Sequence, residues 1–436
     1  MQGLPLLSKS MKQILRRSVR PYLILLFVVS LAVHAVGQEL PKAKPEDVGM
    51  SSERLERLTT TFDGYAKEGR LAGGVTLVIR RGKVVYFRSF GQRDREAGAA
   101  MKTDAIFRIA SQSKAVTSVG IMLLQEQGKL LISDPVSKFL PEFASTTVAV
   151  PKPDGGYDVV KAKRQITIRD LLTHTAGISY GDGPAKDKWQ AAGINGWYFA
   201  DRDEPISATV ARIAALPMDA QPGEKWVYGY STDILGAVIE KVSGQPLDQF
   251  FARSIFDPLK MTDTSFYLPP NKKDRLAAVY GAKGNTVERS PDPGRNTGQG
   301  AYLTGPRKSF SGGAGLLSTA NDYGRFLLML QNGGTLDGKR LLGRKTVELM
   351  TADHLRKIPY NDGQGFGLGF SIVTDIGARG VPSSIGEFGW GGAYHSSYWV
   401  DPKEQLVVVY FTQLIPAGSI DDHGKLRALI YQSIID

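Results

Sequence analysis

The strongest constraint on the fold is a β-hairpin pattern that occurs twice, once near each end of this 436-residue chain. Residues 73–91 hold two runs rich in β-branched and aromatic residues around an Arg-Arg-Gly-Lys turn, and residues 396–413 repeat this design around Asp-Pro-Lys. Apolar residues at helical spacing accompany the hairpins over residues 51–69 and 422–434. Hairpins and helices at both ends predict one antiparallel sheet that is assembled from both ends of the chain and flanked by helices.

The middle of the chain has a different pattern. Helical segments such as ITIRDLL and DILGAVIEKVSG are followed there by an irregular stretch rich in Pro and Gly. We therefore predict an α/β fold whose α/β part comprises about residues 45–150 and 300–436, with a mostly helical inserted region at about residues 160–300. With 42% hydrophobic residues, a chain of this length can bury a large core without disulfides.

The N-terminal 37 residues are predicted to be a secretory signal peptide. A basic segment, KQILRRSVR, precedes the apolar YLILLFVVSLAV, and Ala-Val-Gly at 35–37 offers small residues for cleavage. The apolar run is short for a spanning helix, and an uncleaved anchor, which would make the membrane a partner, is the alternative. We expect an exported protein, periplasmic or secreted, with residues 38–436 as its mature domain.

Composition narrows the possible chemistry. The formal net charge of +11 falls to +6 without residues 1–37, and the basic residues are scattered, so we expect no nucleic-acid partner. The chain has no cysteine, which excludes disulfides, thiolate metal sites and a cysteine nucleophile. The histidines show no metal-ligand spacing. We expect neither a metal nor a cofactor.

The first candidate catalytic residues are Ser111 and Lys114, in the only S-x-x-K of the chain. A spacing of three places both side chains on one helix face, one turn apart. A neutral lysine amine there could take the seryl proton, and the helix N-terminus would favour an oxyanion. The alternative is a capping serine followed by an exposed lysine.

Two tyrosines could supply a proton relay. Tyr228 and Tyr230 stand just before an apolar helical run that begins near Asp233. A phenol close to a lysine can share one proton with it and pass that proton to a leaving group. Aromatic core residues at a helix start are the alternative interpretation.

A glycine pair could open the backbone to a substrate. Gly391 and Gly392 stand where a strand would begin, and glycine lets a ligand approach the main chain closely. The next amide, that of Ala393, would then be free to donate to an oxyanion. A tight turn that enters a strand is the alternative.

A competing nucleophile is Ser179, because GISYG at residues 177–181 matches the G-x-S-x-G elbow. That elbow needs a buried strand before it and a helix after it. LLTHTAG and DGPAKD flank it here, so we predict that Ser179 is a loop residue. A Ser-His-Asp triad stays open, because its members can be far apart in sequence.

Five segments, in the same order, resemble the serine β-lactamase-related family of class C β-lactamases, D-amino-acid-specific peptidases and family VIII carboxylesterases. They are FRIASQSKAVTSV, LLTHTAGISYG, YGYSTDILGAVIEKVSGQPL, GGAGLLSTANDYGRFLLMLQNGG and WGGAYHSSYWVDP. The similarity extends from about Leu40 to the C-terminus. It implies an α/β sandwich with a helical insertion and an active site between these two regions.

The resemblance also implies roles for individual residues. Ser111 would be the acylated nucleophile, Lys114 its base and Tyr228 the tyrosine of the second motif. Tyr228 is preferred because it stands eight positions before Gly236, the spacing of YSxAxDxLG in the esterase branch. The amides of Ser111 and Ala393 would form the oxyanion hole.

Two departures from the β-lactamase pattern favour an ester substrate. The third motif, K-T-G, is here Trp390-Gly391-Gly392, so an indole replaces the cation that meets a substrate carboxylate. The second motif, Y-x-N, ends here in Tyr230, so the asparagine amide that would hold a substrate amide is missing. An aromatic site without these two groups suits an uncharged acyl ester.

These features together predict an exported carboxylesterase that cleaves short acyl esters through an acyl-enzyme on Ser111, with a small-molecule ester as its partner. One alternative is a β-lactamase or D-peptidase in which Lys or Arg from residues 271–307 supplies the missing cation. A transesterase would result if an acceptor alcohol outcompetes water. The alternative that is not an enzyme is a non-catalytic envelope binding protein with this fold. His395 is expected either to face the substrate or to lie at a strand edge.

Overall fold

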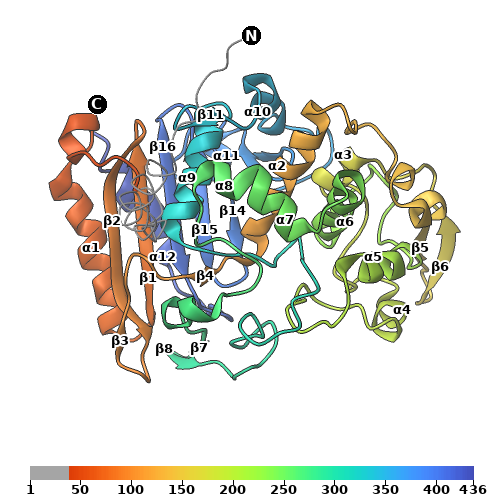
Figure 1. Cartoon of the computed structure of the whole chain (residues 1–436), viewed down its shortest axis with the longest axis horizontal. Helices are drawn as coiled ribbons and strands as arrows, with labels where there is room; N and C mark the ends of the chain where they lie inside the picture. The colour runs from red at the N-terminus through yellow and green to blue at the C-terminus, as the bar shows by residue number, and fades with distance from the viewer. Residues whose placement is uncertain (1–38) are drawn as a thin grey trace, which may run out of the picture. The chain divides into compact units, whose positions relative to one another are not determined.

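An eight-stranded antiparallel sheet forms the centre of the fold (Figure 1). The structure is a computed structural model and describes residues 39–436. The strand order is β12-β13-β14-β15-β16-β1-β2-β3, and every neighbouring pair is antiparallel. The strands are β1 (Gly73–Arg80), β2 (Lys83–Asp94), β3 (Ala99–Ala100), β12 (Gln364–Phe366), β13 (Ser371–Val373), β14 (Phe388–Gly392), β15 (Ser396–Asp401) and β16 (Leu406–Thr412).

The two ends of the chain meet in the middle of this sheet. β1 pairs with β2 on one side and with β16 on the other, with Gly74 opposite Thr412 and Arg80 opposite Leu406. Both predicted hairpins are therefore present, and they share one sheet. This arrangement confirms the predicted fold class, an antiparallel sheet built from both chain ends and flanked by helices.

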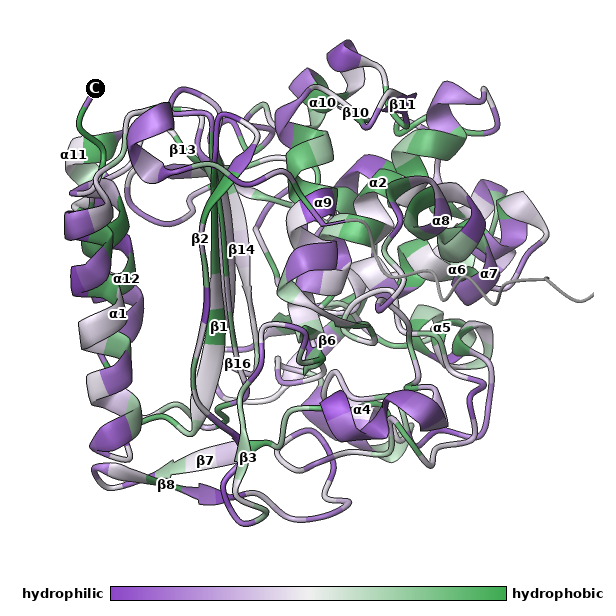
Figure 2. Cartoon of the chain, turned by 60° about the vertical axis from the view of Figure 1, so that its left-hand side comes forward, coloured by the Kyte–Doolittle hydropathy of each residue, from purple (hydrophilic) through white to green (hydrophobic). Residues whose placement is uncertain are grey.

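Helices cover both faces of the sheet (Figure 2). The helices α1 (Ser52–Lys67) and α12 (Asp422–Tyr431) lie on one face, and α2 (Ser113–Glu126) and α9 (Ala320–Gln331) lie on the other. The strand β16 has apolar residues on both faces, because Val408 and Tyr410 pack under α1 and α12 while Val407 and Val409 pack toward α9.

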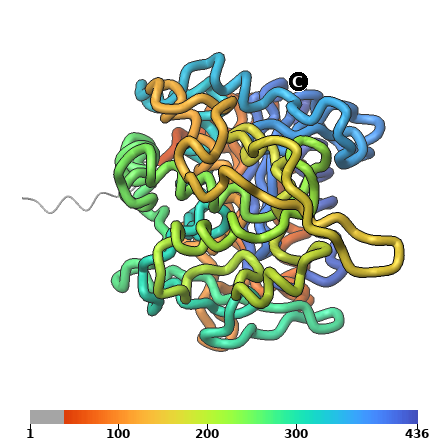
Figure 3. The backbone as a smooth tube through the Cα atoms, turned by 90° about the vertical axis from the view of Figure 1, so that its right-hand side faces the viewer, coloured from red at the N-terminus to blue at the C-terminus, as the bar shows by residue number. Residues whose placement is uncertain are grey.

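The region between residues 160 and 300 contains six α-helices. They are α3 (Ile168–Leu172), α4 (Lys186–Ala191), α5 (Ile206–Ala214), α6 (Ser231–Ser243), α7 (Leu247–Phe251) and α8 (Asp257–Leu259). The hairpin β5 (Thr147–Pro151) and β6 (Tyr157–Lys161) precedes them and projects from the molecule (Figure 3). The stretch predicted to be irregular also contains a hairpin, β7 (Tyr280–Lys283) with β8 (Thr286–Arg289), whose turn includes Gly284 at φ +58°.

The remaining elements are short and join distant segments. They are β4 (Phe107–Arg108) paired with β9 (Leu317–Ser318), β10 (Thr335–Leu336) paired with β11 (Lys339–Arg340), and the helices α10 (Arg344–Met350) and α11 (Ile376–Arg379). The β4–β9 pair matters for the site, because it fixes the segment that leads into Ser111.

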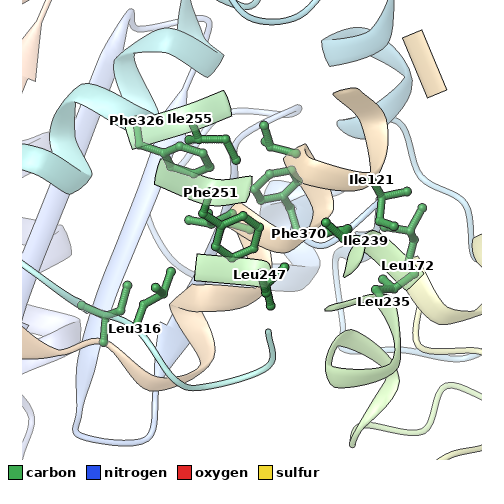
Figure 4. Packing of buried hydrophobic residues seen from close by; sticks show 14 of the residues in the cluster. Ile121, Leu172, Leu235, Ile239, Leu247, Phe251, Ile255, Leu316, Phe326 and Phe370 are labelled. Carbon is green, nitrogen blue, oxygen red and sulfur yellow. The ribbon is translucent and has the colours of Figure 1, made fainter. Parts of the chain in front are cut away.

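One apolar core continues from the sheet into the helical region (Figure 4). Ile121 of α2, Ile239 of α6, Phe251 of α7 and Phe326 of α9 all belong to it. At Gly120 a Cβ atom would lie 2.9 Å from the Ile239 side chain, so glycine permits α2 and α6 to pack this closely. The core therefore fixes α2 between the sheet and the helical region.

The predicted signal peptide, residues 1–37, lies outside the described residues. Within residues 39–436 no helix is both long enough and apolar enough to span a lipid bilayer. Export and signal cleavage therefore stay predictions.

Candidate active site

Ser111 lies in a short 3₁₀ turn, η2 (Ala110–Gln112), immediately before α2. Ala110 is fully buried and has a φ of +43°, which is uncommon for a residue with a side chain. Such backbone strain persists only where the surroundings hold it, and it is frequent at functional sites. Lys114 is only 2% exposed, so the alternative of a capping serine with an exposed lysine is wrong.

The ammonium group of Lys114 lies among oxygen atoms and an aromatic ring. Its Nζ donates to the carbonyl oxygen of Gly313 at 2.9 Å and to the hydroxyl of Tyr180 at 3.0 Å, and it lies 3.4 Å from Oγ of Ser111. The ring centroid of Tyr228 is 4.6 Å from Nζ. Because a hydroxyl can donate as well as accept, the Ser111 hydroxyl can give its proton to Nζ when the amine is neutral.

Tyr180 is a residue of this site that the sequence analysis did not identify. Burial, and then the neighbouring Tyr228 and Asp233, raise its pKa well above the usual value, so the phenol keeps its proton. A sequence signal was present, because Tyr180 follows Ser179 in the GISYG segment. Ser179 itself lies in a loop, as predicted, and its Oγ accepts a hydrogen bond from the amide of Gly181 at 3.1 Å.

The structure separates the roles of the two tyrosines of the second motif. The indole Nε1 of Trp390 donates to the hydroxyl oxygen of Tyr228 at 3.1 Å, which holds this phenol at the site. Tyr230 is fully buried, its hydroxyl donates to the carbonyl oxygen of Gly196 at 2.6 Å, and its ring stacks on Trp189. Tyr230 therefore packs beneath the site and is not among the residues that line the cavity.

A cavity of about 460 Å³ lies directly above Ser111. It is lined by Ser111, Tyr180, Trp197, Tyr228, Trp390, Gly391, Gly392, Ala393, His395, Ser396 and His423. The structure thus brings Ser111, Tyr228 and the predicted residues of the third motif together at one cavity. Across the described part of the chain, no lysine or arginine belongs to this lining, and residues 271–307 contribute nothing to it.

The glycine at position 392 allows β14 to approach the turn that carries Ser111. A Cβ atom on Gly392 would lie 2.6 Å from the carbonyl oxygen of Ile109, closer than real contacts allow. The main chain after Gly392 can therefore lie beside Ser111, which leaves Ala393 next to the candidate nucleophile in the cavity wall.

The buried carboxylate of Asp233 contributes to the position of Lys114 through Gly313. The Oδ1 atom of Asp233, at the start of α6, accepts hydrogen bonds from Ser311 Oγ at 2.6 Å and from the Gly313 amide at 3.1 Å. Burial raises the pKa of Asp233, while the charge of Lys114 opposes this rise. Through Gly313, the carboxylate positions the carbonyl oxygen that accepts from Lys114. Asp233 stands in the YGYSTDILG segment, so a signal for it existed in the sequence.

His395 stands three residues after Gly392, the last residue of the third motif, and lines the same cavity. Its Nε2 is 2.7 Å from Oδ1 of Asp422, which is fully buried. Within residues 39–436, His395, Asp422 and His423 form the one group of potential metal ligands, with ligand atoms within 4.8 Å of one another. The two imidazoles, however, are stacked at 4.0 Å and nearly parallel at 10°, so their in-plane lone pairs do not converge on one ion. The geometry fits a hydrogen-bonded pair better than a metal centre.

Comparison with known proteins agrees with this fold. The family model for Beta-lactamase matches residues 58–431. The chain is 35% identical to Protein Rv1367c of Mycobacterium tuberculosis over 369 residues, which cover 81% of this chain and 88% of that protein. It is 32% identical to Esterase EstB of Burkholderia gladioli over 385 residues, which cover 83% of this chain and 91% of the esterase. The solved structure of EstCE1, a hydrolase with promiscuous acyltransferase activity, has a TM-score of 0.75 and 29% identity and covers 87% of this chain and 99% of its own.

The sheet, the helical layers and the buried lysine beside Ser111 are those of a serine hydrolase of the penicillin-binding and β-lactamase type. The chain belongs to the beta-lactamase family, because the family match extends over most of its length. The resemblance noted in the sequence is therefore confirmed, and so is the prediction that the protein is a serine hydrolase.

Proposed function

We propose that this serine hydrolase is a carboxylesterase that acts on short, uncharged acyl esters. The observation that carries the proposal is the cavity at Ser111, which has aromatic walls from Tyr180, Trp197, Tyr228 and Trp390 and no lysine or arginine among the described lining residues. A β-lactam or a peptide C-terminus brings a carboxylate, and burying an unpaired charge in such a cavity is costly. An ester brings none.

Each group of the site would have a defined task in the reaction. The Ser111 oxygen attacks the ester carbonyl as its proton passes to the Lys114 and Tyr228 pair, and the amides of Ser111 and Ala393 hold the oxyanion. The alcohol leaves after it receives the proton through Tyr228. Water then releases the acyl group from Ser111. Export by residues 1–37 to the periplasm or the medium is part of the same proposal.

The choice of substrate class can be tested with the purified protein that begins after residue 37. We expect rapid turnover of p-nitrophenyl acetate or butyrate and, because the cavity lacks a cation, kcat/KM at least about 10²-fold lower for a chromogenic cephalosporin. Initial rates at equal enzyme concentration provide the measurement. Cephalosporin turnover equal to or above ester turnover would make the protein a β-lactamase. A protein without activity on either substrate would favour a binding function.

The relay through Tyr228 can be separated from the role of Tyr180. We expect Tyr228→Phe to lower kcat for the ester about 10²-fold or more, because the proton carrier is lost. Tyr180→Phe removes one hydrogen-bond partner of Lys114, and we expect a smaller loss of about tenfold. Tyr230→Phe is the matched control, because the Tyr230 hydroxyl bonds to Gly196 away from the cavity. A larger loss from Tyr180→Phe than from Tyr228→Phe would reverse the two assignments.

A further inference from the structure

We propose that His395, held by Asp422, is the base that activates the water or alcohol that takes the acyl group from Ser111. This inference rests on the proposed acyl-enzyme and concerns its second half. It assigns deacylation to the imidazole, whereas the Lys114 and Tyr228 pair serves acylation.

The hydrogen bonds of the pair fix the protonation of the imidazole. An ionised carboxylate only accepts hydrogen bonds, so Nε2 of a neutral His395 carries the proton that points to Asp422 Oδ1, 2.7 Å away. The other carboxylate oxygen accepts from the Tyr410 hydroxyl at 2.8 Å. The lone pair of the imidazole is therefore on Nδ1, which makes no hydrogen bond within residues 39–436 and is the nitrogen available to a molecule in the cavity.

The main chain of the turn between β14 and β15 positions the His395 imidazole close in sequence to Ala393, whose amide is proposed to hold the oxyanion. His395 has a φ of +63°, and its amide donates to the Gly392 carbonyl oxygen at 3.0 Å, which closes the turn from β14 into β15. Tyr394 is fully buried inside this turn and packs edge to face on Trp197. Ser111, Ala393 and His395 all line the cavity, so an acyl group on Ser111 with its oxygen at the Ala393 amide would share this space with His395 and with the attacking water.

The charges around His395 suit a base. Burial acts to raise the pKa of Asp422, but its hydrogen bonds with His395 and Tyr410 bring this pKa below the usual value, so the carboxylate is ionised at neutral pH. Burial lowers the pKa of His423, which stacks on the His395 ring, so His423 stays neutral. Burial and the Asp422 charge raise the pKa of Tyr410, so that phenol keeps its proton. From the other elements around the cavity, the titratable groups are those of Lys114, Tyr180 and Tyr228.

The step balances without any further reactant. The water oxygen forms a bond to the acyl carbon while one water proton passes to Nδ1 of His395, and the negative charge of Asp422 stabilises the imidazolium. The bond between the acyl carbon and Oγ of Ser111 then breaks. The proton passes from the imidazolium to Oγ, directly or through cavity water, and the carboxylic acid leaves. An alcohol in place of water would give a new ester by the same transfers.

Stopped-flow measurements with p-nitrophenyl acetate separate the two half-reactions. For His395→Gln we expect the burst of p-nitrophenol, which reports acylation, to stay within about threefold of the wild type, while the steady-state rate falls about 10²-fold. Quenched samples should contain acetylated Ser111, detected by mass spectrometry.

Two further variants and a chemical rescue distinguish a role of His395 in deacylation from a structural role. Asp422→Asn should show the same selective loss of deacylation, and its thermal unfolding checks that the buried position tolerates the change. His354→Gln, in a loop outside the cavity, is the control that should leave both phases unchanged. Hydroxylamine, which attacks acyl-enzymes without a general base, should restore turnover in His395→Gln.

Several results would overturn the proposal. Unchanged deacylation in His395→Gln would leave that step to Lys114 and Tyr228, and an equal loss of both phases would make His395 a structural residue. Loss of wild-type activity with a chelator, restored by zinc, would make the cluster a metal site instead. Absence of acetylated Ser111 from the wild type and every variant would refute the proposed function itself, and this inference with it.

Discussion

The variant Ser111→Ala is expected to lose ester hydrolysis by a factor of about 10⁴ or more, because the proposed acyl intermediate forms on the Ser111 oxygen. The Ser111 hydroxyl lies 3.4 Å from Lys114 Nζ, and Ser111 lines the cavity. Initial rates with p-nitrophenyl butyrate measure the loss, and circular dichroism shows whether the variant keeps its fold. The alanine side chain fits the 3₁₀ turn, so we expect an unchanged melting temperature.

Ser179→Ala is the matched control for that loss. Its hydroxyl accepts a hydrogen bond from Gly181 within its own loop, so we expect nearly full activity. Full activity in Ser111→Ala together with loss in Ser179→Ala would make Ser179 the nucleophile and would contradict the proposed mechanism.

Lys114→Met is expected to lower kcat/KM about 10³-fold, because the methionine side chain fills the space of the lysine but cannot accept the seryl proton. Lys114 is 2% exposed and contacts Ser111, Tyr180 and Gly313. The measurement is kcat/KM for the same ester over a range of pH.

Lys114→Arg separates proton transfer from charge. Arginine keeps the positive charge but does not give up its proton in proteins, so this variant should be as inactive as Lys114→Met. An active Lys114→Arg would show that the residue acts through its charge alone, and an active Lys114→Met would require another base.

The main features of the fold could be predicted because they repeat along the sequence. The pairs β1 with β2 and β15 with β16 are each two runs rich in β-branched and aromatic residues around a short turn, and the terminal helices α1 and α12 have apolar residues at helical spacing. The pair β4–β9 could not be predicted, because two residues carry no period and their partners lie more than 200 positions apart. The hairpin β7–β8 was missed because its strands have four residues each and stand in a stretch rich in Gly and Pro.

The candidate site could be predicted where its residues are close together in the sequence. Ser111 and Lys114 are one turn apart on the chain, so their spacing alone places them together. Tyr180, by contrast, contacts Lys114 across 66 positions. The GISYG segment marks Tyr180 as a neighbour of Ser179, but it does not indicate that Lys114 is its partner. His395 was a candidate, but its partner Asp422 belongs to a different element, so the pair became visible only in the structure.

The pairing of β1 with β16 also determines when this protein can fold. Gly74 lies opposite Thr412, so one edge of β1 stays unpaired during synthesis until almost the whole chain has left the ribosome. β14, which carries Gly392 to Ser111, belongs to the same late part of the chain. An unpaired, apolar strand is a site for aggregation. The chain therefore has to keep its first strands from aggregating until its last strands arrive, and only then can the catalytic cavity form.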